Sequence, residues 1–333
     1  MVNVTLQHKA IEVVPYSEEF KEKWDHFVEH RALNSTFLHS RRFYDHNPLN
    51  SLDDASLMFF ENNRMIAVFP AVLHQVNGIV VLHSHLRATY GGFLLSRQVG
   101  VEKAIRIVGQ TIAFAREKGA RQIIVRNPFR IYHTRLCDET DYAMWYHGFS
   151  IKSREIETAV QLTGAMRSFR SEYHKGTKYS LGKSRNNVTV RLSDDFRGFW
   201  TLLENCLLER HGIRPVHDYE AICRLREKVG ADKVMLFSAF YKDRLIGGNV
   251  VFNFRNVVLH GQYNASDHEF QHLGPLHAVV DYILEWSLSR GFKYFNMGTS
   301  NLCNGTQINP GLFYYKEGFG GRGFLRETMF LDL

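Results

Sequence analysis

One stretch, residues 271–300, constrains the fold of this chain more than any other (QHLGPLHAVVDYILEWSLSRGFKYFNMGTS). Gly274 frees the backbone to turn, and Pro275 suits the first helical position, where its missing N–H would have had no partner. Apolar residues then recur at helical spacing until Gly291, and an aromatic strand follows. A loop that leads into a helix presents unpaired N–H groups, so this stretch can hold a phosphate or a developing oxyanion. The alternative is an ordinary crossover helix.

The elements expected in the first half of the chain recur in the same order in the second half. In the first half we expect a helix at 17–30, a hairpin at 56–72, a strand at 79–83, a helix at 101–118 and a strand at 121–125. In the second half we expect a helix at 196–210, a hairpin at 233–254, a strand at 256–263, and the helix and strand of 271–300. Two similar α/β domains explain this order, each an antiparallel meander followed by a helix and a parallel strand. The alternative is a chance similarity of two generic hairpins.

Length and composition agree with two folded domains. The chain has 333 residues, which is long for one compact core, and its 44% hydrophobic and 23% charged residues are typical of a globular protein. The formal charge of +7 favours a phosphorylated partner, such as a nucleotide or coenzyme, without demanding a nucleic acid. We place the domain boundary between residues 163 and 164.

The cysteines and the N-terminus indicate a cytoplasmic protein without a metal. Cys137, Cys206, Cys223 and Cys303 are scattered and form no C-x-x-C pair, so neither a zinc site nor a disulfide framework is expected. The N-terminus lacks the basic start and apolar core of a signal peptide, and no apolar run reaches the length of a membrane span.

Several motifs carry a resemblance to known transferases. The loop from Gln271 to Gly274 and the helix after it resemble the acyl-CoA-binding half of the GNAT acyltransferases, whose pattern is Gln/Arg-x-x-Gly-x-Gly/Ala; the last position here is Leu276. The doubled arrangement, with FLHS at 37–40, ATYGGFLL at 88–95 and GLFYYKEGFGGR at 311–322, is similar to the Fem peptidoglycan aminoacyl transferases. It is still more similar to the FemAB-like, GNAT-fold proteins of polysaccharide gene clusters.

The resemblance implies a fold, a reaction and partners. The fold would be tandem GNAT-like domains of α/β (α+β) class, with mixed, mostly antiparallel sheets flanked by helices. Residues 1–163 would form the acceptor side and residues 164–333 the acyl-donor side. The chain would move an acyl group from acyl-CoA, acetyl-CoA first among the donors, to the amine of an amino sugar, nucleotide sugar or similar metabolite of cell-envelope polysaccharide synthesis. Two alternatives are an aminoacyl-tRNA-dependent Fem-type transferase, with tRNA as partner, and a non-catalytic binding protein of the same fold.

The donor site is expected around the glycine loop. Gln271, Gly274 and Leu276 would hold the donor. Tyr263 and Asn264 end the preceding strand, which in a GNAT-like fold faces the thioester, so Tyr263 is a catalytic candidate and Asn264 a donor-binding one. The alternative for both is a strand-end turn. No Cys or Ser lies in a nucleophile motif, so we expect the amine to attack directly, without an acyl-enzyme.

Lys316 is the strongest single candidate for catalysis. It stands among aromatic residues and glycines, where its ammonium group could hold a phosphate or polarise the acyl carbonyl. The matching Lys of the Fem enzymes lies at the reaction centre. The alternative is a salt bridge to Glu317 or another carboxylate. Arg322 is a weaker candidate for a phosphate clamp.

Two further segments are candidates for substrate binding. A basic run at 167–185 contains Lys178, which matches a phosphate-binding Arg of the Fem enzymes; the alternative is a solvated helix face. The loop at 209–217 follows a helix and resembles an acceptor-side loop. Its His211, a catalytic candidate, or His217 could take a proton from the attacking ammonium, with Arg214 beside them. A lone His is more often structural.

Overall fold

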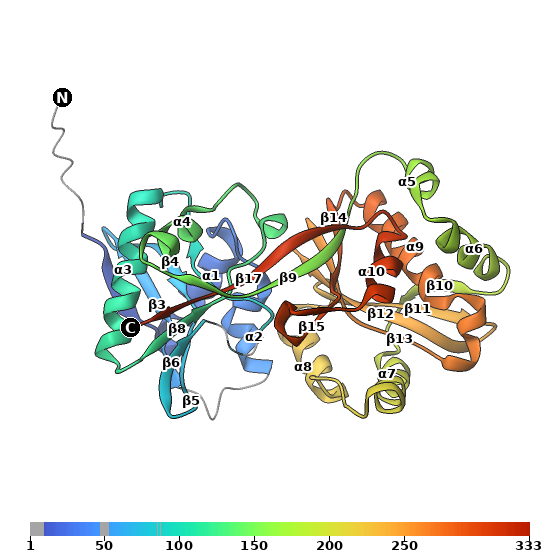
Figure 1. Ribbon diagram of the computed structural model, residues 1–333, viewed down its shortest axis with the longest axis horizontal. Coiled ribbons are helices and arrows are strands. Elements are labelled where there is room, and N and C mark those ends of the chain that lie inside the picture. The colour runs from blue at the N-terminus through green and yellow to red at the C-terminus, as the bar shows by residue number, and fades with distance from the viewer. Residues whose placement is uncertain (1–9, 47–52, 85, 87) are drawn as a thin grey trace. The chain divides into compact units, whose positions relative to one another are not determined.

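The computed structural model describes residues 10–46, 53–84, 86 and 88–333 (Figure 1). The chain divides into two compact units, the first made of residues 1–154 and 327–333 and the second of residues 155–326. The boundary expected after residue 163 lies inside the second unit. The reason is that β9 (Ser150–Gln161) pairs with β14 of the second unit from Glu157 onward. The chain ends in the first unit because the last residues of β17 (Arg322–Asp332) pair with β8 there.

The first unit contains two sets of strands. One is antiparallel, in the order β1-β3-β4-β7, and the other follows the order β17-β8-β6-β5-β2. Their bounds are β1 (Glu12–Pro15), β2 (Asp53–Asp54), β3 (Leu57–Glu61), β4 (Arg64–Phe69), β5 (Val72–Val76), β6 (Ile79–His83), β7 (Leu94–Leu95) and β8 (Gln122–Val125). The helices are η1 (Glu18–Phe20), α1 (Lys21–His30), η2 (Phe37–His39), α2 (Arg41–His46), α3 (Val101–Glu117), η3 (Arg130–Tyr132) and α4 (Glu139–Tyr146).

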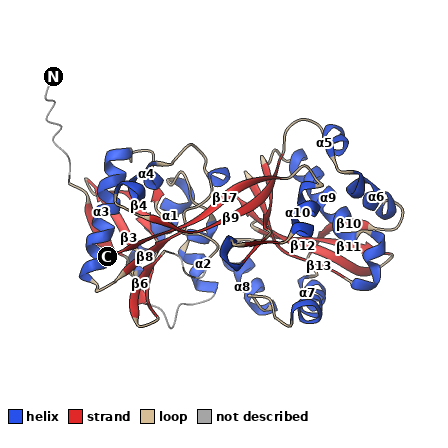
Figure 2. Cartoon of the chain, in the orientation of Figure 1, coloured by secondary structure: helices blue, strands red, loops and turns tan. Residues whose placement is uncertain are grey.

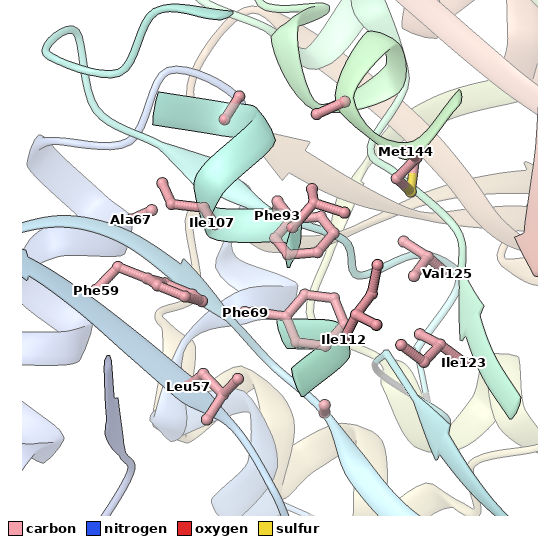
Figure 3. Close-up of a cluster of buried hydrophobic side chains, with 14 of the residues drawn as sticks. Leu57, Phe59, Ala67, Phe69, Phe93, Ile107, Ile112, Ile123, Val125 and Met144 are labelled. Carbon is pink, nitrogen blue, oxygen red and sulfur yellow. The ribbon is translucent and has the colours of Figure 1, made fainter. Parts of the chain in front are cut away.

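The core of the first unit lies between α3 and the strands (Figure 3). Ile107 and Ile112 of α3 project toward Phe69 and Phe93, whose rings stack with their centroids 4.3 Å apart. The β3–β4 turn has two asparagines in the left-handed region, at φ 50° and 59°, which matches the twist of an antiparallel hairpin. The predicted hairpin is therefore confirmed.

The second unit contains one set of strands in the order β10-β11-β12-β13-β14-β9. Their bounds are β10 (Thr189–Ser193), β11 (Val234–Tyr241), β12 (Arg244–Phe254), β13 (Val258–Ser266) and β14 (Tyr294–Thr299), with a small ribbon of β15 (Asn301–Leu302) and β16 (Gln307–Ile308). The helices are α5 (Met166–Glu172), α6 (Lys175–Ser184), α7 (Phe196–His211), α8 (Tyr219–Val229), η4 (His268–Leu273), α9 (Pro275–Ser289), η5 (Cys303–Gly305) and α10 (Pro310–Glu317).

Helices cover both faces of these strands (Figures 1 and 2). On one face, the apolar stripe of α9, including Val280 and Ile283, packs on Phe237 and Ile246. On the other face, α7 packs on β12 and β13, and Gly248 gives the space that the Phe199 ring needs. A Cβ at Gly248 would lie 2.9 Å from that ring, so only glycine allows this contact.

The predicted fold class is confirmed in both units. The strand before the long helix and the strand after it pair in parallel, as β6 with β8 in the first unit and as β13 with β14 in the second. The other pairings are antiparallel within each unit. The result is a mixed, mostly antiparallel α/β architecture with helices on the sheet faces.

Candidate active site

The site is built where two parallel strands of the second unit part. β13 and β14 pair only through Val258–His260 and Tyr294–Asn296. Beyond these residues both strands change register with their other neighbours: β13 against β12 after Gly261, and β14 against β9 after Asn296. Each irregularity is a bulge, which turns a strand away from its partner. The two strands therefore separate, and side chains from several elements enter the gap.

A small cavity of about 40 Å³ lies in this gap. Three residues predicted for the site line it together: Asn264 of β13, Leu276 of α9 and Lys316 of α10. The structure thus joins the donor loop to the closing segment of the sequence. The other lining residues come from the same elements and from β12 and β14: Asn249, Gly261, Val279, Val280, Phe295, Met297, Leu312 and Tyr315.

Lys316 is buried, with 4% of its surface exposed. Its Nζ donates to the carbonyls of Gly298 and Thr299, each at 2.8 Å, rather than to the Glu317 carboxylate. An ammonium group has three N–H donors, so one is left for a ligand in the cavity. Burial lowers the pKa of Lys316 from its ordinary value of 10.5 to about 8, while the nearby Glu157 carboxylate acts in the opposite direction. The amine can therefore exchange a proton near neutral pH.

The glycines after Lys316 allow the chain to fold back tightly over it. A Cβ at Gly321 would lie 2.7 Å from the Lys316 carbonyl oxygen, and one at Gly318 would lie 2.4 Å from Thr177 Oγ1. Tyr315, the residue before the lysine, donates its hydroxyl to the carbonyl of Leu276 at 3.2 Å. This bond ties α10 to the first turn of α9.

The glycine turn has the left-handed conformation expected of it, with φ +67° at Gly274. Its N–H donates to the carbonyl of Gln271. The N–H groups of Leu276 and His277, in the first turn of α9, have no acceptor among the described residues. The backbone of α6 approaches the turn, because a Cβ at Gly274 would lie 2.9 Å from the Ser180 carbonyl oxygen.

Tyr263 lies on the other face of the sheet from Asn264, the next residue along β13. Its ring packs edge-on against Trp200 of α7, with centroids 5.3 Å apart, and its hydroxyl is 2.5 Å from His217 Nδ1. The bulge between Gly261 and Tyr263 shifts the alternation of β13, so Gly261 and Asn264 share the cavity face. Tyr263 and His217 therefore form a pair on the α7 side, away from the cavity that Lys316 lines.

The remaining predicted residues lie outside the cavity. Gln271, Arg214 and Arg322 are exposed. Lys178 donates to the carbonyl of Ser171 at 2.7 Å and lines a separate hollow of about 560 Å³ between α5, α6, β10 and α9. His211 ends α7, and its side chain lies outside the described residues.

Sequence reasoning missed the buried polar residues around the cavity. Asn249 of β12 is 5% exposed, and its Oδ1 has no partner within the part of the chain that the structure describes. Asn296 and Glu157, at 0% and 1% exposure, lie beneath Lys316 and bond to each other. A signal was available, since each asparagine interrupts an otherwise apolar strand sequence. A buried polar side chain needs a partner or a function.

Over residues 10–46, 53–84, 86 and 88–333, no group of three or more His, Cys, Asp or Glu residues is placed to hold a metal ion. Among the helices of these residues, none combines the length and the apolar character that a membrane crossing requires.

Comparisons with known proteins agree with this geometry. Residues 165–317 match the family model described as "Acetyltransferase (GNAT) domain". No curated protein sequence matches the chain. Among solved structures, the crystal structure of FemX is similar to this chain, with a TM-score of 0.70 and 12% sequence identity. The alignment covers 97% of this chain and 97% of the FemX chain.

Two further structures share the fold over nearly the whole length. A tandem GNAT protein from the clavulanic acid biosynthesis pathway has a TM-score of 0.56 and 10% identity, and covers 97% of this chain and 98% of its own. L-PGS from Bacillus licheniformis has a TM-score of 0.56 and 14% identity, and covers 93% of this chain and 91% of its own.

The GNAT domain match at residues 165–317 supports an acyltransferase, and the solved structures show that the shared fold extends over both units. FemX shares the fold of both units.

Proposed function

We propose that the protein is an N-acyltransferase that moves an acyl group from acyl-CoA to the amine of an amino sugar, a nucleotide sugar or a similar metabolite of cell-envelope polysaccharide synthesis. The main observation in support is the cavity between β13 and β14, where the buried Lys316 and Leu276 of the first turn of α9 lie together. In this proposal the second unit binds the donor and the first unit belongs to the acceptor.

The donor fits residues of the second unit. The free N–H groups of Leu276 and His277 suit a phosphate or another oxyanion. The unpaired Oδ1 of Asn249 suits an amide N–H of a pantetheine chain. The thioester supplies an activated carboxyl group, and the remaining N–H of Lys316 is suited to donate to the acyl oxygen.

Direct attack by the amine is favoured by what lines the cavity. The described lining residues include no cysteine and no serine, and the one hydroxyl, of Tyr315, is engaged with the Leu276 carbonyl. The attacking ammonium must first lose a proton to a base within reach of the cavity, and the predicted base His217 lies on the other side of the sheet, paired with Tyr263. Lys316, with a pKa of about 8, is suited to give a proton to a departing thiolate, whose own ordinary pKa is about 8.5.

The test is a donor and acceptor screen. The protein is incubated with acetyl-CoA and longer acyl-CoAs, each with a panel of amino sugars and nucleotide amino sugars, and thiol release is measured. Lys316→Ala is the inactive comparison and exposed Lys175→Ala the matched control. We expect release that depends on both partners and falls at least tenfold in Lys316→Ala only. Absence of release and of acyl-CoA binding by calorimetry would refute the proposal.

A second candidate is transfer from aminoacyl-tRNA, which the Fem resemblance implies. The observation that favours it is the row of exposed cations on α5 and α6. Of these, Arg170 is engaged by Asp281 and Glu285 at 2.7 and 2.8 Å. Others, including Lys175 and Lys183, have no carboxylate partner among the described residues. Such a row suits a phosphate backbone.

The tRNA alternative makes a separate prediction. Binding should weaken steeply with salt, and changing Lys175, Lys178 and Lys183 together to Ala should reduce the slope of log affinity against log salt by about two to three. A triple variant that binds tRNA with the wild-type slope would exclude this surface.

A further inference from the structure

A chain of buried hydrogen bonds leads from β9 to Lys316. Glu157 of β9 accepts from Asn296 Nδ2 at 2.7 Å. Asn296 Oδ1 in turn accepts from the N–H of Gly298 at 2.8 Å. The carbonyls of Gly298 and Thr299 accept from Lys316 Nζ. Every link joins groups of the second unit, and the two side chains at its base are almost fully buried.

The middle of this chain is the bulge of β14. The strand pairs with β9 at Asn296 and again at Thr299, but the register shifts between them. Gly298 takes a left-handed conformation there, with φ +74°. A bulge releases backbone groups from the ladder, so the Gly298 and Thr299 carbonyls can turn to the lysine. The side chain of Asn296 holds the released Gly298 N–H in place of a neighbouring strand.

We propose that Glu157 and Asn296 are positioning residues for Lys316: by fixing the β14 bulge, they aim its two carbonyls at the ammonium group and so direct the lysine into the cavity. This inference rests on the proposed function for its catalytic meaning. Neither residue touches the cavity, so they act through Lys316 rather than on a substrate. Two carbonyls without charge hold the ammonium in one place and leave its third N–H for a ligand.

Three other charged or titratable groups face this arrangement. Arg326 of β17 donates to Glu157 at 3.3 Å and lies 3.2 Å from Glu155. His260 of β13 is buried among Glu157, Arg326 and Lys316, and its burial lowers its pKa. Glu157 thus compensates two cations, the buried Lys316 and the partly buried Arg326. Removing its charge and removing the Asn296 link are therefore expected to affect Lys316 in opposite directions.

The test measures the reactivity of Lys316 without any substrate. The whole protein is labelled with trace acetic anhydride across a pH series, and acetylation of Lys316 is compared with that of exposed Lys175 by peptide mass spectrometry. In the wild type we expect the pH at which acetylation of Lys316 is half-maximal to lie well below the corresponding pH for Lys175. This pH is called the midpoint below. Asn296→Ala frees the bulge and admits water, so the midpoint should rise toward that of Lys175. Glu157→Gln keeps an acceptor for Asn296 but loses the charge, so the midpoint should fall.

The matched control is Asn253→Ala. Asn253 is also buried on a strand, and its Oδ1 also accepts a backbone N–H, that of Asn256 at 2.9 Å, but it serves a remote turn. We expect this variant to lose stability without moving the Lys316 midpoint. A wild-type midpoint in Asn296→Ala, with folding shown by circular dichroism, would overturn the inference.

Turnover separates this inference from the proposed function. With acetyl-CoA and an accepted amine, kcat should fall at least tenfold in Asn296→Ala and only a few-fold in Glu157→Gln. If labelling responds as expected but Lys316→Ala keeps full turnover, the positioning network stands and the catalytic role of Lys316 fails. If Lys316→Ala is inactive but Asn296→Ala is unchanged in both measurements, only the positioning role fails.

Discussion

Replacing Lys316 by Met tests whether burial of the charged Lys316 amine destabilises the folded protein. Burial lowers its pKa from 10.5 to about 8 in the folded protein. At a pH between these two pKa values, Lys316 is protonated in the unfolded chain and deprotonated in the folded chain. The free energy of unfolding therefore rises with pH in this window: the destabilisation from burying the charged amine is complete below pH 8, where both states are protonated, and is lost as the pH rises to 10.5.

The magnitude follows from the two pKa values. Each pKa unit corresponds to about 1.4 kcal/mol, so the full difference is about 3 kcal/mol, of which about 2 kcal/mol falls between pH 7 and pH 9.5. Methionine has a similar length and no titratable group. Over that range we expect the wild type to gain about 2 kcal/mol of stability relative to Lys316→Met, by the same linkage.

The assay is urea denaturation of both proteins at pH 7 and pH 9.5. Taking the difference between them removes the contribution of every other titrating group. Lys175→Met, an exposed lysine on α6, is the matched control and should show the same pH dependence as the wild type. If the difference in unfolding free energy between wild type and Lys316→Met is the same at both pH values, Lys316 is hydrated in the folded protein and is not buried against the cavity.

Three other changes test the surroundings of the lysine, and Gly100→Ala in the first unit is the control for Gly274→Ala. Gly274→Ala should cost about 1–3 kcal/mol in a thermal melt and weaken acetyl-CoA binding by calorimetry, because φ is +67° and the Ser180 carbonyl lies 2.9 Å from the added Cβ. Gly100→Ala, at the start of α3 with φ −96° and open space around it, should be tolerated. Tyr315→Phe should cost about 1 kcal/mol in urea, since one hydrogen bond is lost. Asn249→Ala should keep the fold and raise KM for the acyl donor at least fivefold, whereas an unchanged KM would remove this residue from the site.

The local pattern of the sequence predicted most of the second unit. Gly274 and Pro275 predicted the start of α9, and the helical spacing of its apolar residues predicted its length. Both signals depend only on residues close in sequence. The strand at 322–332 and the helix α8 were not expected. β17 is stabilised by pairing with distant segments, and a strand of this kind has little signal of its own.

The candidate site was predicted only in part, because local motifs identify some of its residues while others depend on strand pairing. Lys316 and Leu276 carried local motifs, and the structure places them on one cavity. Tyr263 was grouped with Asn264 because they are neighbours in sequence, yet adjacent strand residues face opposite sides of a sheet. The bulge after Gly261 decides which of them meets Lys316, and its position depends on the pairing with β12, which no local pattern shows.

The two units differ where their equivalent helices begin, and this difference favours the second unit as the donor site. Gly274 has the left-handed backbone that ends one turn and starts α9 against α6, and the strands beyond it part around a cavity. Gly100 starts α3 in an extended conformation, with nothing packed against its position. Under the proposed function, only the donor-binding unit needs the turn, the parted strands and the buried lysine. The match of the GNAT domain model to residues 165–317 falls on the copy that has all three.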